Sequence, residues 1–167
     1  MVQRILVING HPDSSEPHFC AALVDAYLDG AVKAGHEVRR IDLATLDFPL
    51  LRSQREFEGG ELPDNLKPAA DSLSWASHVV IVFPLWLGTM PALLKGFLEQ
   101  VARPGVAFEY GPDHKSGKPK LGGRSARLIV TMGMPPILYR LWFLSHGVAG
   151  LRRSILNFVG IRPVRET

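Results

Sequence analysis

The chain has 167 residues, of which 46% are hydrophobic and 21% are charged, and its formal net charge is +3. This composition excludes a disordered, collagen-like or low-complexity chain, and the length predicts one domain over residues 1–167. The basic residues form no long run, so nothing indicates a nucleic-acid-binding surface. Cys20 is the only cysteine, which excludes an internal disulfide and a cysteine zinc cluster. We therefore expect a cytoplasmic protein with no metal site and no membrane insertion.

The first part of the chain alternates strand and helix patterns. Residues 3–9 form an apolar run that ends at Gly10, which predicts a buried strand and a turn. Helical spacing predicts a helix over 19–34, and a second short strand follows over 37–42. A weaker helical pattern covers 66–75, after an irregular polar stretch.

The middle of the chain gives the strongest signals. A buried strand is predicted over 78–83, and Thr89 is the N-cap candidate of a helix that runs to Val101. A polar insertion rich in glycine and proline covers 111–123, and a fourth strand follows over 125–131.

The last part predicts two helical pieces over 137–146 and 150–159, broken at Gly147, and a final strand over 161–165. Strands that alternate with helices indicate a parallel sheet with right-handed crossovers. The sequence therefore predicts a three-layer flavodoxin-like α/β fold, with a five-stranded parallel sheet of order 2-1-3-4-5. The winding reverses between strands one and three, so a ligand is expected above their carboxyl ends.

The loop over 10–18 leads to the start of the first helix, where free backbone N–H groups and the helix dipole favour an anion. Ser14 and Ser15 offer hydroxyl donors there, although Asp13 and Glu16 oppose a phosphate. The alternative is that the two serines only cap the helix. No Gly-x-Gly-x-x-Gly or P-loop motif is present, which argues against those phosphate sites.

The loop over 84–91 places Trp86 where the third strand leaves the sheet. An apolar loop at this point of the fold favours a flat, apolar ligand, whereas the alternative is that Trp86 belongs to the core. The loop over 131–136 follows the fourth strand and reaches the same edge. Tyr139 and His146 come next, seven residues apart, which would place them two helical turns apart on one face.

One stretch resembles a known family closely. Residues 83–98, from Phe-Pro-Leu-Trp-Leu-Gly-Thr-Met-Pro onward, together with 103–110, are similar to the NAD(P)H:quinone oxidoreductase family of flavodoxin-like flavoproteins. The opening Gly10-His11-Pro12 and the segment His18-Phe19-Cys20 extend the resemblance towards the N-terminus. The resemblance implies a flavin, FMN or FAD, with NAD(P)H as cosubstrate and ping-pong two-electron reduction of a quinone.

The resemblance also implies a set of site residues. Those around the flavin phosphate and ribityl chain would be His11, His18, Phe19 and Cys20. Those lining the isoalloxazine ring would be Pro84, Leu85, Trp86 and Leu87. The loop of Thr131, Met132, Gly133 and Met134 would meet the pyrimidine edge, although two of its four positions differ from the family pattern.

The family carries a tyrosine and then a His-Gly pair downstream of that loop, and Tyr139 and His146 stand at matching positions. The resemblance gives them the catalytic role: Tyr139, backed by His146, would donate a hydrogen bond to the flavin as negative charge develops on it.

A homodimer is also expected. Phe108 and Tyr110 match an aromatic pair that in the family reaches the partner's flavin, while the alternative is a small local cluster. We also expect apolar surface over the later strands on the face that the first helix covers, because the sequence stops soon after the last strand.

Two other functions stay open. Similar proteins act as ancillary regulatory subunits of potassium-efflux systems, where binding a membrane partner matters more than turnover. A one-electron flavodoxin-type carrier ranks last, because those carriers have a phosphate loop rich in threonine and serine that this sequence lacks.

Overall fold

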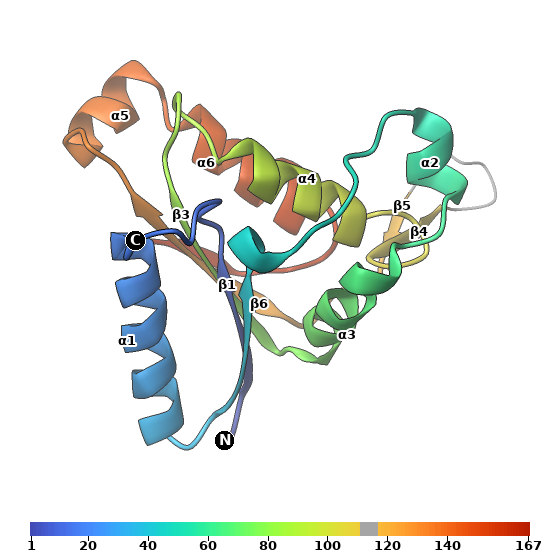
Figure 1. Cartoon of the computed structure of the whole chain (residues 1–167), viewed down its shortest axis with the longest axis horizontal. Coiled ribbons are helices and arrows are strands. Elements are labelled where there is room, and N and C mark those ends of the chain that lie inside the picture. The colour runs from blue at the N-terminus through green and yellow to red at the C-terminus, as the bar shows by residue number, and fades with distance from the viewer. Residues whose placement is uncertain (111–116) are drawn as a thin grey trace.

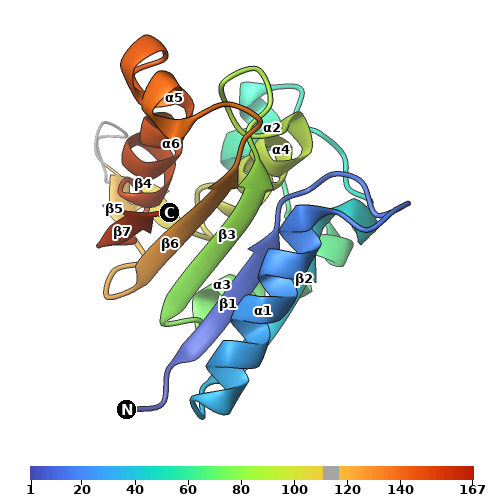
Figure 2. The same ribbon diagram turned by 90° about the vertical axis from the view of Figure 1, so that its left-hand side faces the viewer.

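The computed structural model of the chain describes residues 1–110 and 117–167, and its centre is one parallel β-sheet (Figures 1 and 2). The sheet has five strands in the order β2-β1-β3-β6-β7, and every pairing in it is parallel. The strands are β1 (Arg4–Asn9), β2 (Glu37–Asp42), β3 (His78–Pro84), β6 (Ser125–Thr131) and β7 (Val164–Glu166). This order confirms the predicted fold, since it is 2-1-3-4-5 when only the strands of this sheet are counted.

Helices cover the sheet unevenly. The helix α1 (Phe19–Lys33) lies alone on one face, and the other helices gather on the opposite face or beyond the strand ends (Figure 1). These are α2 (Gln54–Gly59), α3 (Lys67–Trp75), α4 (Ala92–Val101), α5 (Pro136–Trp142) and α6 (His146–Gly150), with 3₁₀ turns η1 (Leu43–Thr45) and η2 (Asp64–Leu66) and the π-helical turn η3 (Leu151–Leu156). A separate hairpin pairs β4 (Phe108–Tyr110) with β5 (Gly117–Pro119). Part of the predicted insertion, residues 111–116, falls outside the described residues.

The alternation of side chains along the strands separates two cores. Leu6 and Ile8 of β1 face the larger core, while Ile5 and Val7 face the smaller core under α1. β3 is buried on both faces, which explains its continuous apolar run.

On the face of the sheet that α1 covers, the part formed by β6 and β7 is charged. This corrects the expectation of apolar surface over the later strands. Ala126 and Leu128 of β6 belong to the larger core, so the intervening Arg127 points to the α1 side. Arg165 of β7 is its register partner and lies on the same face. Ile129 of β6 packs against the smaller core, and Thr131 at the end of the strand contacts Cys20 of that core.

The helical break after β6 also differs from the prediction. It falls at Leu144 and Ser145, whose φ angles of 49° and 52° are left-handed, and Gly147 lies inside α6. The reason Gly147 is a glycine is close packing: a Cβ there would lie 2.3 Å from the Gly88 carbonyl oxygen. The final strand is also shifted, because β7 begins at Val164.

Candidate functional site

Backbone hydrogen bonds hold the three loops together at the carboxyl edge of the sheet. The Gly10 N–H donates to the Val82 carbonyl oxygen at 2.7 Å, and the Leu85 N–H donates to the Thr131 carbonyl oxygen at 2.7 Å. Gly10 also packs closely, since a Cβ there would lie 3.0 Å from Cβ of Phe83. The sequence-based expectation that the loops after β1, β3 and β6 converge is therefore confirmed.

Three aromatic side chains link the first loop to the second. The His11 and His18 rings stack with centroids 3.7 Å apart, and the Trp86 ring meets His11 edge to face at 5.9 Å. His11 is buried, whereas Trp86 is 48% exposed. The alternative that Trp86 belongs to the core is therefore wrong, and its indole is free to contact a ligand.

Asn9, which the sequence analysis did not single out, fixes the first loop. It is buried at the end of β1, its amide donates to Asp42 Oδ1 at 3.0 Å, and its own oxygen accepts from the His11 N–H at 3.3 Å. The sequence feature that indicates a role for Asn9 is a polar residue at the end of an apolar strand. Such a residue needs partners when it is buried.

Asp13 organises the rest of this loop. Its Oδ1 accepts from the Ser15 N–H at 2.8 Å, and its Oδ2 lies 3.0 Å from His18 Nε2. The hydrogen bonds from Ser15, followed by that from His18, lower the pKa of Asp13 to about 2. The carboxylate therefore stays ionised at neutral pH and holds the His18 ring in place.

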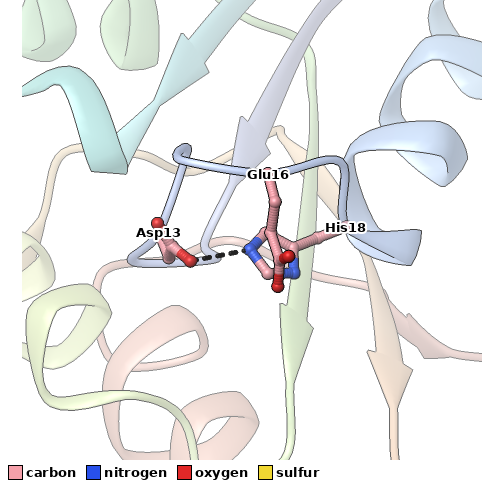
Figure 3. A group of neighbouring side chains, drawn as sticks. All are labelled: Asp13, Glu16 and His18. Carbon is pink, nitrogen blue, oxygen red and sulfur yellow. Dashed lines mark hydrogen bonds and ion pairs between the residues drawn. The ribbon is translucent and has the colours of Figure 1, made fainter.

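Asp13, Glu16 and His18 form a small group at the surface, in which His18 is half-buried (Figure 3). Their oxygen and nitrogen atoms lie within 4.8 Å of one another, a spacing that could suit a cation. Both carboxylate oxygens of Asp13 are already engaged inside the loop, however. We therefore interpret the group as the frame of the loop.

The N-terminus of α1 is open to an anion. The helix begins at Phe19 with His18 as its N-cap residue, and no side chain among the described residues caps it. The alternative that Ser14 and Ser15 cap this helix is therefore wrong. Uncapped N–H groups at the positive end of a helix of 15 residues form a suitable phosphate site.

Cys20 lies in the first turn of α1 and is buried. Its Sγ is 3.4 Å from Thr131 Oγ1, which ties the helix to the third loop. Burial raises the pKa of the Cys20 thiol, so the sulfur stays protonated at neutral pH. We assign Cys20 a packing role beside the anion site rather than that of a nucleophile.

The second loop is a tight, strained turn. Trp86 and Thr89 exchange backbone hydrogen bonds of 2.9 and 3.0 Å, and Leu87 and Gly88 between them have φ angles of 49° and 80°. Thr89 is thus part of this turn and not the helix N-cap that we expected, since α4 starts after Pro91. A left-handed leucine is costly and is typical of ligand-binding loops. Its side chain is fully exposed.

Tyr139 is buried against this turn. Its hydroxyl donates to the Gly88 carbonyl oxygen at 2.9 Å and accepts from the Val148 N–H at 3.4 Å. This differs from the expectation that the hydroxyl points at a flavin, because its proton is already used within the protein. Tyr139 and His146 also do not share one helical face, since α5 ends at Trp142 and α6 begins at His146.

His146 is exposed and lines a groove of about 630 Å³ between the second loop and α6. Trp86, Leu87, Met90 and Leu151 give the groove a mainly apolar wall, and Lys95 adds a cation that the sequence analysis missed. The groove is large enough for a flat ring system. The two residues predicted to act as a pair therefore differ in burial, because Tyr139 is buried and His146 is exposed.

The remaining predicted residues fall into two groups. Thr131, Met132 and Met134 are half-buried at the same edge, and both methionine side chains pack on the larger core. Phe108 is only 2% exposed and packs against Phe158, with ring centroids 4.9 Å apart. The hairpin of β4 and β5 lies far from α5 and the carboxyl edge (Figure 1). The packing of Phe108 favours the local-cluster alternative for that residue.

Fold and site together define a class: a doubly wound α/β protein with an uncapped helix N-terminus and an apolar groove at the carboxyl edge of its sheet. Comparison with known families agrees, because residues 3–167 match the family described as Flavodoxin-like fold. The chain belongs to this family.

The sequence identity between the chain and individual relatives is low. The chain is 28% identical to a ribosyldihydronicotinamide dehydrogenase-like protein of Penicillium crustosum, covering 92% of this chain and 64% of that protein. It is 27% identical to an FMN-dependent NADH:quinone oxidoreductase of Macrococcus caseolyticus, covering 98% of this chain and 84% of that protein. The structure of an NAD(P)H:quinone oxidoreductase from Methanothermobacter marburgensis superposes with a TM-score of 0.79 at 21% identity, covering 100% of this chain and 83% of that one. The chain thus spans less than two thirds of the Penicillium protein.

Proposed function

We propose that the chain binds a flavin at the carboxyl edge of its sheet and acts as an NAD(P)H:quinone oxidoreductase. The observation that carries this proposal is the junction of the uncapped α1 N-terminus with the half-exposed Trp86 and the apolar groove. A flavin mononucleotide needs both features, an anion site for its phosphate and a flat apolar wall for its ring. The names of relatives such as the Macrococcus enzyme favour FMN.

The residues present fit such a group. The backbone N–H groups of Phe19 and Cys20 and the His18 ring would hold the phosphate, with His11 beside the ribityl chain. Pro84 to Leu87 would line the ring, and residues 131–134 would meet its polar edge. When bound, the flavin supplies the redox chemistry by accepting two electrons from NAD(P)H and passing them to the acceptor.

The chain's own residues would position and shield the reactants. Trp86 and Leu87 provide a stacking wall that excludes water, and Tyr139 fixes the Gly88 carbonyl below them. His146 is placed in the groove, where a hydrogen-bond donor stabilises developing negative charge. In this proposal His146 is the catalytic residue and Tyr139 positions the loop.

We further propose a homodimer in a reducing, cytoplasmic compartment. The free thiol of Cys20 supports the compartment. None of the described helices has the length and hydropathy to cross a bilayer. Tyr110 would approach the partner's groove, as the similarity of Phe108 and Tyr110 to the aromatic pair of the family implies.

The test uses the purified full chain titrated with FMN, followed by flavin fluorescence, and then NADPH oxidation with a soluble short-chain quinone. We expect saturable FMN binding and rapid turnover. Failure to bind FMN would overturn the proposal. Tight FMN binding with negligible turnover would favour the regulatory-subunit alternative instead.

A further inference from the structure

A polar pocket opens on the face of the sheet that α1 covers, at the amino ends of the strands. The helix α1 packs on β1, β2 and β3, and β6 and β7 lie beside it (Figure 2). A pocket of about 250 Å³ forms there, and no acidic side chain is among the described residues that line it. Its polar lining residues are Gln3, Tyr27, His78, Ser125, Arg127 and Arg165.

The alternation of side chains along the strands explains why these polar groups share one face. His78 lies two residues before Val80, which belongs to the smaller core under α1, so His78 faces the same side of the sheet. Arg127 and Arg165 are register partners on β6 and β7. Neighbouring strands are about 4.8 Å apart. The sheet therefore holds two like charges side by side.

The two arginines have no charge partner within the described chain. Neither the Arg127 nor the Arg165 side chain forms an ion pair or a hydrogen bond there. Glu166 is the next residue along β7, but it pairs with Arg152 at 3.0 Å. Adjacent guanidinium groups repel each other, and an anion between them removes that repulsion. Their planar N–H donors also match the oxygens of a phosphate group.

His78 adds a hydroxyl donor to the pocket. Its Nδ1 lies 2.8 Å from Ser125 Oγ, and its Nε2 lies 3.3 Å from the Tyr27 hydroxyl. Burial, followed by the positive charges of Arg127 and Arg165, lowers the pKa of His78, so the ring is neutral at neutral pH. A neutral imidazole donates from one nitrogen and accepts at the other. One of the two hydroxyls therefore keeps its proton free for a ligand.

This set of donors fits a phosphate group better than a carboxylate. Two guanidinium groups, one hydroxyl and the Gln3 amide can donate from different directions. A tetrahedral phosphate accepts hydrogen bonds from all of these directions, whereas the two oxygens of a carboxylate lie in one plane. The volume of about 250 Å³ is below that of pockets for drug-sized ligands, so the ligand is compact.

We propose that this pocket binds the phosphate group of a small molecule, held between Arg127 and Arg165. A hydroxyl of Ser125 or Tyr27 supplies a further donor. The bound phosphate neutralises the paired arginines and therefore also stabilises the folded chain.

The pocket is separate from the proposed flavin site. His78 is the first residue of β3 and Pro84 is the last. At a rise of about 3.3 Å per residue, roughly 20 Å separate the two ends of this strand. Neither the first turn of α1 nor the groove lined by Trp86 and Leu87 contributes a residue to the pocket. Phosphate binding here is therefore independent of whether the chain binds a flavin.

The test is an NMR titration of the full chain with inorganic phosphate at constant pH and ionic strength. The ring resonances of His78 are the readout, and their loss in His78→Gln identifies them. We expect a saturable shift of these resonances. Arg127→Gln and Arg165→Gln should each weaken binding roughly tenfold, because each removes one charge-assisted contact. Both variants remove one of two like charges, so both should fold at least as stably as the wild type.

Arg55→Gln is the matched control, since it removes the same charge. Arg55 is exposed on α2, which lies far from α1 (Figure 1), and its replacement should leave the phosphate affinity unchanged. Weakening of binding by Arg55→Gln as large as that by Arg127→Gln would overturn the proposal. A phosphate shift confined to the backbone resonances of Phe19 and Cys20, at the start of α1, would overturn it too.

Two further titrations define the ligand. Binding of glycerol 3-phosphate at least as tight as that of inorganic phosphate would assign the pocket to a phosphorylated molecule. Binding of inorganic phosphate alone would assign it to the free ion. Acetate should bind roughly tenfold more weakly, because it carries less charge and fewer acceptor oxygens. Equal affinities for acetate and phosphate would refute the assignment to a phosphate group.

Discussion

The hydroxyl of Tyr139 donates a hydrogen bond to the carbonyl oxygen of Gly88 at 2.9 Å. The bond joins α5 to the turn that follows β3, two segments that lie far apart in the sequence. Gly88 and its neighbour Leu87 both have left-handed backbone conformations, so this turn needs support from outside. Tyr139 provides that support from the buried side of the turn. Trp86 and Leu87 are exposed on its outer side, where a ligand can reach them.

Replacing Tyr139 with phenylalanine should therefore affect both stability and cofactor binding. The change leaves the Gly88 carbonyl without its partner and should lower the free energy of unfolding by about 1–3 kcal/mol. The loosened turn should also weaken FMN binding. Urea denaturation and FMN titration are the measurements.

Tyr27→Phe is the matched control for that change. The Tyr27 hydroxyl lies 3.3 Å from His78 Nε2, at the other end of the sheet. Its loss should leave FMN affinity unchanged. If the two variants bind FMN equally well, Tyr139 does not position the turn.

His146→Gln should behave differently. The His146 side chain is exposed, so stability should change by no more than about 0.5 kcal/mol. Loss of a donor in the groove should slow reduction of the bound flavin by NADPH roughly tenfold, a modest effect because a flavin spreads its charge. Stopped-flow absorbance of the FMN-loaded protein measures this. An unchanged reduction rate would remove His146 from the mechanism.

The sequence predicted the convergence of the loops because some residue types in these positions have one common structural role. A strand followed by a glycine, the Pro-Leu-Trp-Leu-Gly turn and the spacing of β6 were enough to predict which loops converge. The direction of a side chain was not predictable in the same way. Whether Tyr139 faces a ligand or the Gly88 carbonyl depends on the break at Leu144 and Ser145, where neither residue type favours a left-handed conformation.

The charged face of β6 and β7 shows the same limit. The alternation of Ala126, Arg127 and Leu128 was visible, yet which residues face the larger core depends on the pairing register with β3. The burial of Phe108 likewise depends on contact with Phe158, which lies fifty residues further along the chain. Contacts between residues far apart in the sequence determine the burial of these side chains. Local sequence patterns carry no information about such contacts.

Asp13 makes the first loop sensitive to acid. Its pKa is lowered from 3.8 to about 2 in the folded chain, mainly by hydrogen bonds from Ser15. A carboxyl group with a depressed folded pKa stabilises the protein above its unfolded pKa, and this contribution is lost as the pH falls through the folded value. Stability should therefore decline between pH 4 and pH 2, and Asp13→Asn should flatten that decline. Thermal unfolding across this range provides the comparison, and identical slopes for both proteins would contradict it.

The two glycines of α6 allow a sharp test of how tightly this segment packs on the second loop. A Cβ at Gly147 would lie 2.3 Å from the Gly88 carbonyl oxygen and 2.6 Å from Cα of Thr89, so Gly147→Ala must displace backbone. We expect a loss of about 1–3 kcal/mol in the free energy of unfolding and weaker FMN binding, because the displaced turn carries Trp86 and Leu87.

Gly150→Ala is the control within the same helix, since a Cβ there meets no atom within 4 Å. Alanine favours the helical conformation over glycine by up to about 1 kcal/mol, so this variant should be equally stable or more stable. Both variants add one methyl group, and only their surroundings differ. A stable Gly147→Ala with unchanged FMN affinity would show that α6 and the second loop can separate without consequence for the site. Opposite signs for the two substitutions in urea denaturation would establish that the contact of Gly147 with Gly88 shapes the groove.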